Sequence, residues 1–120
     1  MIEKVNLAAK LAQFDDQWSP KIVGELGDQY LKVVKVKGEF VWHHHDDEDE
    51  LFYVVRGHLV IRLRDGDVEL DPGEFAVIPQ GIEHLPVAEE EVHILLIEPK
   101  TTLNTGNVVG DRTVEVPQRI

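Results

Sequence analysis

The sequence predicts an all-β domain with one short helix near its N-terminus, and three observations support this. From Tyr30 onward the chain consists of brief runs of β-branched, aromatic and aliphatic residues, which favour strands. Gly, Pro and Asp residues that suit tight turns lie between these runs. Within a run, apolar and polar residues alternate, as expected for a half-buried strand. Several short strands at close spacing are typical of a β-barrel or a β-sandwich.

The composition is that of a single folded unit. The chain has 120 residues, of which 42% are hydrophobic, enough to fill one core. No internal repeat and no linker divides it, so we expect one domain over residues 1–120.

Charge and residue usage exclude several functions. A formal net charge of −11 would repel a phosphate backbone, so we expect no nucleic-acid partner. The absence of cysteine rules out disulfides and thiolate metal sites. No apolar run reaches membrane length and the first residues lack a signal-peptide pattern, so we expect a cytoplasmic protein without a membrane partner.

The first predicted element is a short amphipathic helix. Asn6 can cap its start, and Leu7, Leu11 and Phe14 fall on one helical face. The Ser19-Pro20 pair then interrupts the helical pattern.

The remaining elements are strands joined by turns. Strands are predicted over residues 31–36, 40–42, 51–55, 59–63, 75–78 and 92–97, with turns at 56–57, 65–66, 71–73 and 80–81. Alternation over the run 59–63 places Leu59, Ile61 and Leu63 on the face toward the core. Residues 101–120 are mostly polar and look weakly structured unless they dock.

Histidines and a carboxylate form the candidate site. His43 and His45 are two residues apart in a predicted extended segment, so both imidazoles share a face with Cα atoms about 6.6 Å apart. That arrangement can chelate one ion, while His44 should point to the opposite face. Glu50 begins the next strand on its cavity side, whereas His84 comes near only if the sheet closes.

Two segments resemble the two conserved motifs of the cupin superfamily. The first has the pattern His-x-His, four residues, Glu, six residues, Gly, and is matched by His43, His45, Glu50 and Gly57. The second is matched by Gly73, Pro79, Gly81 and His84. Two departures occur: four residues instead of five separate Gly38 from His43, and Ala88 replaces the closing Asn.

The resemblance covers about Leu31 to Pro99 and implies a cupin double-stranded β-helix, a jelly-roll-like barrel. Residues 1–30 would then form an N-terminal helix and arm, and residues 100–120 a C-terminal tail. It also implies one divalent metal ion (Fe, Mn, Zn or Ni) held by His43, His45, Glu50 and His84.

The function implied is action on a small polar metabolite, as a metal-dependent oxygenase or a sugar-type isomerase. The alternative is a non-catalytic module that binds or senses a small molecule through an anchoring metal. No catalytic residue emerges. The nearest candidates are expected at the surface or in packing, and they are Tyr53, Arg56, His58, Gln80 and His93.

A homodimer is expected because the segments outside the barrel have no core of their own. The apolar helix face would need cover from a second subunit. The alternative is a monomer in which the helix folds back over its own barrel.

Overall fold

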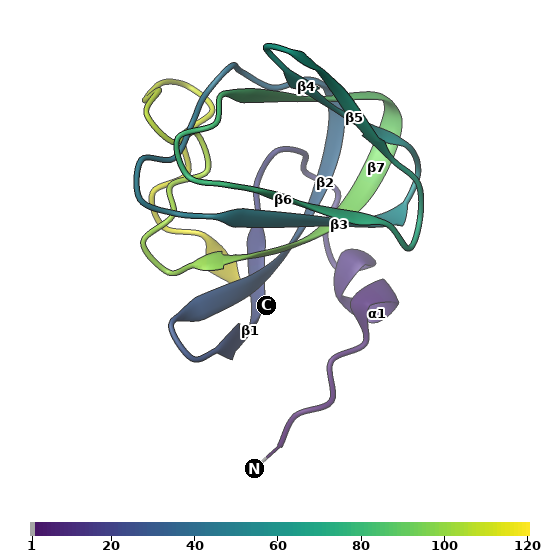
Figure 1. Cartoon of the computed structure of the whole chain (residues 1–120). Coiled ribbons are helices and arrows are strands. Elements are labelled where there is room, and N and C mark those ends of the chain that lie inside the picture. Colours follow the sequence, from purple (N-terminus) through teal and green to yellow (C-terminus); the bar gives the residue numbers. More distant parts are fainter. Residues whose placement is uncertain (1) are drawn as a thin grey trace.

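The computed structural model describes residues 2–120 and has one helix and eight strands in that range (Figure 1). This confirms the predicted all-β class with a short N-terminal helix. The elements are α1 (Leu7–Leu11), β1 (Lys21–Leu26), β2 (Gln29–Glu39), β3 (Glu50–Arg56), β4 (Leu59–Leu63), β5 (Gly66–Leu70), β6 (Phe75–Ile78), β7 (His84–Pro99) and β8 (Gln118–Arg119).

The long strand β7 organises the sheet. One of its edges pairs antiparallel with β2 from Pro99 back to Val87. Its other edge pairs first with β4, where His84 lies opposite Leu63, and then with β3. The β4–β5 hairpin therefore curls over the β3–β6 pair (Figure 1). The sheet encloses a core without closing into a continuous ladder, because its path runs from β5 to β8 with β3 and β6 branching from β7.

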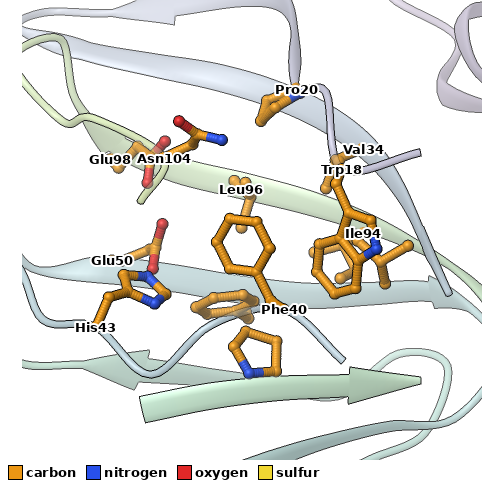
Figure 2. Close-up of a pocket in the computed structure, with 13 residues that line it drawn as sticks. Trp18, Pro20, Val34, Phe40, His43, Glu50, Ile94, Leu96, Glu98 and Asn104 are labelled. Carbon is orange, nitrogen blue, oxygen red and sulfur yellow. The ribbon is translucent and has the colours of Figure 1, made fainter. Parts of the chain in front are cut away.

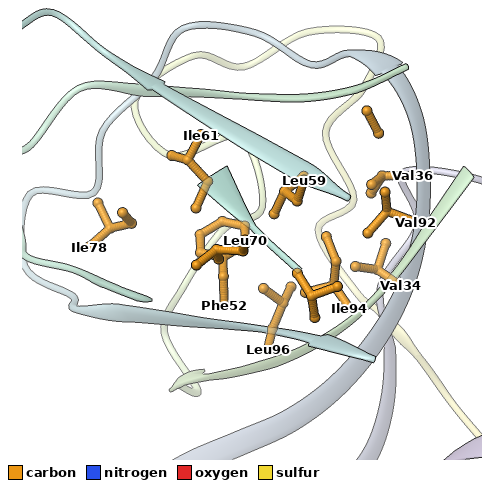
Figure 3. Close-up of a cluster of buried hydrophobic side chains, with 12 residues drawn as sticks. Val34, Val36, Phe52, Leu59, Ile61, Leu70, Ile78, Val92, Ile94 and Leu96 are labelled. Carbon is orange, nitrogen blue, oxygen red and sulfur yellow. The ribbon is translucent and has the colours of Figure 1, made fainter. Parts of the chain in front are cut away.

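The core lies between the β4–β5 hairpin and the β3–β6 pair. Leu59 and Ile61 are completely buried, whereas Val60 between them is only partly buried and Arg62 is exposed, which confirms the predicted alternation. Burying each such aliphatic side chain contributes roughly 1.5–3 kcal/mol. Figure 3 shows the cluster, whose members are Val34, Val36, Phe52, Val54, Leu59, Ile61, Leu70, Ile78, Ala88, Val92, Ile94 and Leu96.

The helix packs against its own sheet. The Asn6 side chain accepts a hydrogen bond of 3.0 Å from the backbone N–H of Ala9, which is the predicted cap. Leu11 is buried against Val23 and Val33, and Phe14, just beyond the helix, joins the same cluster. The apolar helix face is thus covered within one chain, so it supplies no reason for a partner subunit.

The structure lacks one strand that the sequence predicted and contains three strands that the sequence did not predict. Residues 40–42 form no strand, because β2 ends at Glu39 after a bulge near Gly38. The strands β1, β5 and β8 were not predicted. The tail also docks: Thr105 is 2% exposed, and β8 lies parallel to β1 with Gln118 opposite Lys21.

Gly57 shows why a glycine stands in the turn after β3. Its φ is +92°, and a Cβ there would lie 2.9 Å from the carbonyl oxygen of Glu91. Only a residue without a side chain fits both requirements. Within residues 2–120, no helix is long and apolar enough to cross a membrane.

Candidate metal centre

His43 and His84 are brought together by the backbone. The N–H of His43 donates to the carbonyl of His84 at 3.1 Å, and the N–H of His84 donates back to the carbonyl of His43 at 2.9 Å. This isolated antiparallel bridge joins the segment after β2 to the start of β7. Their rings lie 4.2 Å apart between centroids.

The tautomers of both rings are set by backbone carbonyls. Nδ1 of His43 donates to the carbonyl of Val41 at 2.8 Å, and Nδ1 of His84 donates to that of Ile82 at 2.9 Å. A neutral imidazole carries one proton, so each Nε2 keeps its lone pair. Such a hydrogen bond on the remote nitrogen is characteristic of metal-ligating histidines.

Four side chains converge on one point. One ligand atom each from His43, His45, Glu50 and His84 lies within 4.8 Å of all the others, and all four residues are buried. Oε1 of Glu50 is 3.5 Å from Nε2 of His45 and 3.4 Å from Nε2 of His84. The structure therefore brings together the four residues that the sequence singled out.

Three of these converging atoms have no hydrogen-bond partner: Nε2 of His45, Nε2 of His84 and Oε1 of Glu50. Unpartnered buried polar atoms are costly, by about 1–3 kcal/mol each. A divalent cation at their common centre would satisfy all three. The nitrogen and oxygen donors suit Fe, Mn, Ni or Zn, so the site could hold such an ion.

The electrostatics favour neutral imidazole beside a charged carboxylate. Burial, followed by the nearby His84 ring, lowers the pKa of His43 to about 4. Burial alone would raise the pKa of Glu50, but the neighbouring Glu98 side chain and then the rings of His45 and His84 keep that pKa well below its usual value. These are the protonation states that metal ligands require.

His44 turns away from this cluster. Its Nε2 lies 2.8 Å from Oδ1 of Asp46 at the surface. Its backbone is held by the C-terminal tail, because its N–H donates to Oδ1 of Asn107 at 2.8 Å and its carbonyl accepts from the Asn107 N–H at 3.0 Å. Gly106 packs so closely on the His44 carbonyl that a Cβ would collide with it. The tail thus fixes the segment that carries His43 and His45.

A cavity opens beside His43 and Glu50 (Figure 2). Its volume is about 40 Å³. Most of its lining is apolar, and the lining residues are Trp18, Pro20, Val34, Val36, Phe40, His43, Glu50, Phe52, Pro86, Ile94, Leu96, Glu98 and Asn104.

Glu98 is a site residue that the sequence analysis missed. It is 1% exposed and accepts a hydrogen bond of 2.9 Å from Nζ of Lys32 at Oε1. Burial, followed by the negative charge of Glu50, raises its pKa well above the usual value. The alternation Ile94, Leu96, Glu98 along a buried strand could have indicated an inward carboxyl group. No sequence signal marked Trp18, which comes from outside the barrel strands.

The other sequence candidates lie away from the cavity lining. His58 is exposed between Glu69 and Asp71, at 3.0 and 2.7 Å. His93 lies 3.0 Å from Oε1 of Glu91 on the outer side of β7. The cavity is likewise not lined by Tyr53, Arg56 or Gln80.

The fold and the site define a small protein whose curled β-sheet encloses a core beside a cluster of three histidines and one glutamate. The Cupin_2 family model, described as "Cupin domain", matches residues 30–98. The chain therefore belongs to the cupin family.

A solved structure and one curated relative match most of the chain. A cupin-2 domain containing protein from Shewanella frigidimarina is 48% identical with a TM-score of 0.79, over 80% of this chain and 94% of that one. The uncharacterized protein YdbB of Bacillus subtilis is 32% identical over 70% of this chain and 75% of its own length.

Two further relatives are named dioxygenases. Acireductone dioxygenase of Bacillus subtilis is 31% identical over 60% of this chain and 43% of its own length. The 3-hydroxyanthranilate 3,4-dioxygenase of Ruegeria pomeroyi is 32% identical over 65% of this chain and 46% of its own length. The chain spans less than half the length of these two enzymes.

Proposed function

We propose that this cupin binds one divalent metal ion through His43, His45, Glu50 and His84 and acts on a small molecule as a metal-dependent dioxygenase. One observation carries the proposal: fixed tautomers and buried, unpartnered ligand atoms converge on one point. The similarity to two named dioxygenases supports this reaction class over the sugar-type isomerase.

The residues of the chain have distinct parts in this function. The three imidazoles and the carboxylate would hold the ion, which when bound supplies Lewis acidity and, for iron, reactivity toward O₂. The mostly apolar walls of the adjoining cavity lower the local dielectric, which strengthens electrostatic interactions inside it. Glu98, hydrogen-bonded to Lys32, sits beside Glu50, and burial together with the charge of Glu50 raises the pKa of Glu98.

The test begins with metal-free protein titrated with Fe(II) under anaerobic conditions, and separately with Mn(II), Ni(II) and Zn(II), by calorimetry. One ion per chain is expected. Oxygen uptake by the iron-loaded protein, screened against small metabolites, then separates a dioxygenase from the alternative, a module that binds a small molecule without turnover. Binding of a ligand with no product under any metal would establish that alternative.

We also propose that the whole chain, residues 1–120, works as a homodimer of single-domain subunits. The observation behind this is an exposed apolar strip on the outer face of β6 and β3. Phe75 is 61% and Val77 49% exposed, and they lie opposite Tyr53 and Leu51. Exposed strips of this kind on an edge strand commonly mark interfaces. A cytoplasmic location stays a prediction of the sequence.

A further inference from the structure

The cavity beside the metal centre has two chemically different ends. Figure 2 places His43, Glu50, Glu98 and Asn104 together at one end, and Trp18, Val34 and Ile94 at the other, with Phe40 and Leu96 between them. Such a separation matters because each end selects a different part of a ligand.

The apolar end offers no hydrogen bond. The indole N–H of Trp18 donates outward to the carbonyl of Lys37 at 2.9 Å, so it is not available inside. The other side chains of this end, such as Val34 and Ile94, carry no polar atoms. A hydroxyl group placed there would lose its hydrogen bonds to water without replacement, at a cost of a factor of ten or more in affinity.

Trp18 is held in place at a conformational cost. Its φ of +60° is unusual for a residue with a side chain, and such strain concentrates at functional positions. Its backbone N–H donates to the carbonyl of Lys35 at 2.8 Å. Its ring stacks on Phe40 with centroids 4.7 Å apart, and the Arg112 guanidinium lies 5.5 Å from the indole. The fold therefore forces this indole onto the cavity.

We infer that the ligand is a small amphipathic molecule with a chelating oxygen group at one end and a short apolar body at the other, and that Trp18 selects the apolar body. This rests on the proposed metal site, which would receive the chelating group. The small volume, about 40 Å³, limits the body to a few atoms. The inference replaces the polar metabolite expected from the sequence and disfavours sugars, which carry hydroxyl groups along their whole length.

Two probes of equal size test this. Butyrohydroxamic acid and 3-hydroxypropanohydroxamic acid share the same chelating group and differ only in a terminal methyl or hydroxyl. Their affinities for the zinc-loaded protein are measured by calorimetry. The methyl probe should bind about tenfold more tightly. Equal affinities, or a preference for the hydroxyl probe, would overturn the inference.

Matched variants test whether the preference for the methyl probe arises in this cavity. Trp18→Leu should reduce it to less than about threefold, whereas Trp42→Leu should retain it, because Trp42 lies away from the cavity lining and against the Arg64 guanidinium at 3.7 Å. If Trp18→Leu fails to fold, Val34→Thr serves instead, since its added hydroxyl should also weaken the preference. A preference unchanged in both variants would contradict the assignment to this cavity.

A separate titration distinguishes failure of the proposed metal site from failure of this inference about the ligand. Zinc is first titrated without probe, and absence of binding there refutes the metal site alone. The same probe pair is then compared on metal-free protein by ligand-observed NMR. If the metal-free protein also prefers the methyl probe and the preference depends on Trp18, the inference is supported. If the metal-free protein shows no such preference, the inference is overturned.

Discussion

Asn107 clamps the backbone of His44 on both sides. The side-chain Oδ1 of Asn107 accepts from the His44 N–H at 2.8 Å, and its backbone N–H donates to the His44 carbonyl at 3.0 Å. These bonds tie the C-terminal tail, outside the matched residues 30–98, to the segment that carries two proposed metal ligands.

The first prediction concerns this clamp. Asn107→Ala should lower zinc affinity about tenfold, because hydrogen bonds behind a metal site typically contribute tenfold to hundredfold. It should cost only about 1 kcal/mol in unfolding free energy, as expected for one lost hydrogen bond. Calorimetric titration and chemical denaturation measure the two effects. Asn107→Asp keeps the acceptor oxygen and should restore most of the affinity; affinity equal to the parent in the alanine variant would rule out a positioning role.

The second prediction contrasts the histidines of the triplet. His43→Ala and His45→Ala should each weaken metal binding at least about a hundredfold. His44→Ala should change it by less than about threefold, because that ring points to Asp46 at the surface. His84→Ala should behave like His43→Ala. Loss of the ion in His44→Ala, with binding kept in either neighbour, would contradict the assignment of the ligands.

A third prediction is the pH dependence of the metal-free protein. The pKa of His43 falls from 6.5 to about 4 on folding, so between these values the unfolded chain binds the extra proton. Stability should therefore decrease as pH falls from about 6.5 to about 4, by up to about 3 kcal/mol from this group.

Comparison with His43→Gln isolates that contribution. Glu98, whose pKa is raised by burial and by Glu50, has the opposite pH dependence but is present in both proteins. Denaturation curves at several pH values should show a shallower slope for the variant. Parallel slopes would mean that His43 does not carry a lowered pKa.

The fourth prediction concerns the dimer. Val77→Glu should dissociate it, because the change places a charge in the exposed apolar strip of a chain whose net charge is already −11. Val109→Glu is the control, since Val109 is 73% exposed in the C-terminal tail and should leave the dimer intact. Sedimentation equilibrium over a wide concentration range gives the masses. A parent mass near 13.6 kDa at every concentration would refute the dimer.

The sequence by itself determined several of the local elements and the identity of the clustered residues. Period-two alternation placed Leu59 and Ile61 inward and Arg62 outward, because a strand side-chain repeat is set by covalent geometry. The Asn6 cap was predictable since its contacts are only three residues away. Motif spacing singled out His43, His45, Glu50 and His84.

Only the tertiary structure decided what depends on contacts between distant segments. The reciprocal bridge from His43 to His84 and the clamp of Asn107 on His44 have no local signal. The same is true of the indole of Trp18 over the cavity and of the helix packing on its own sheet. Such contacts form when the whole chain buries its apolar surface, and that choice depends on shape complementarity across the fold rather than on neighbouring residues.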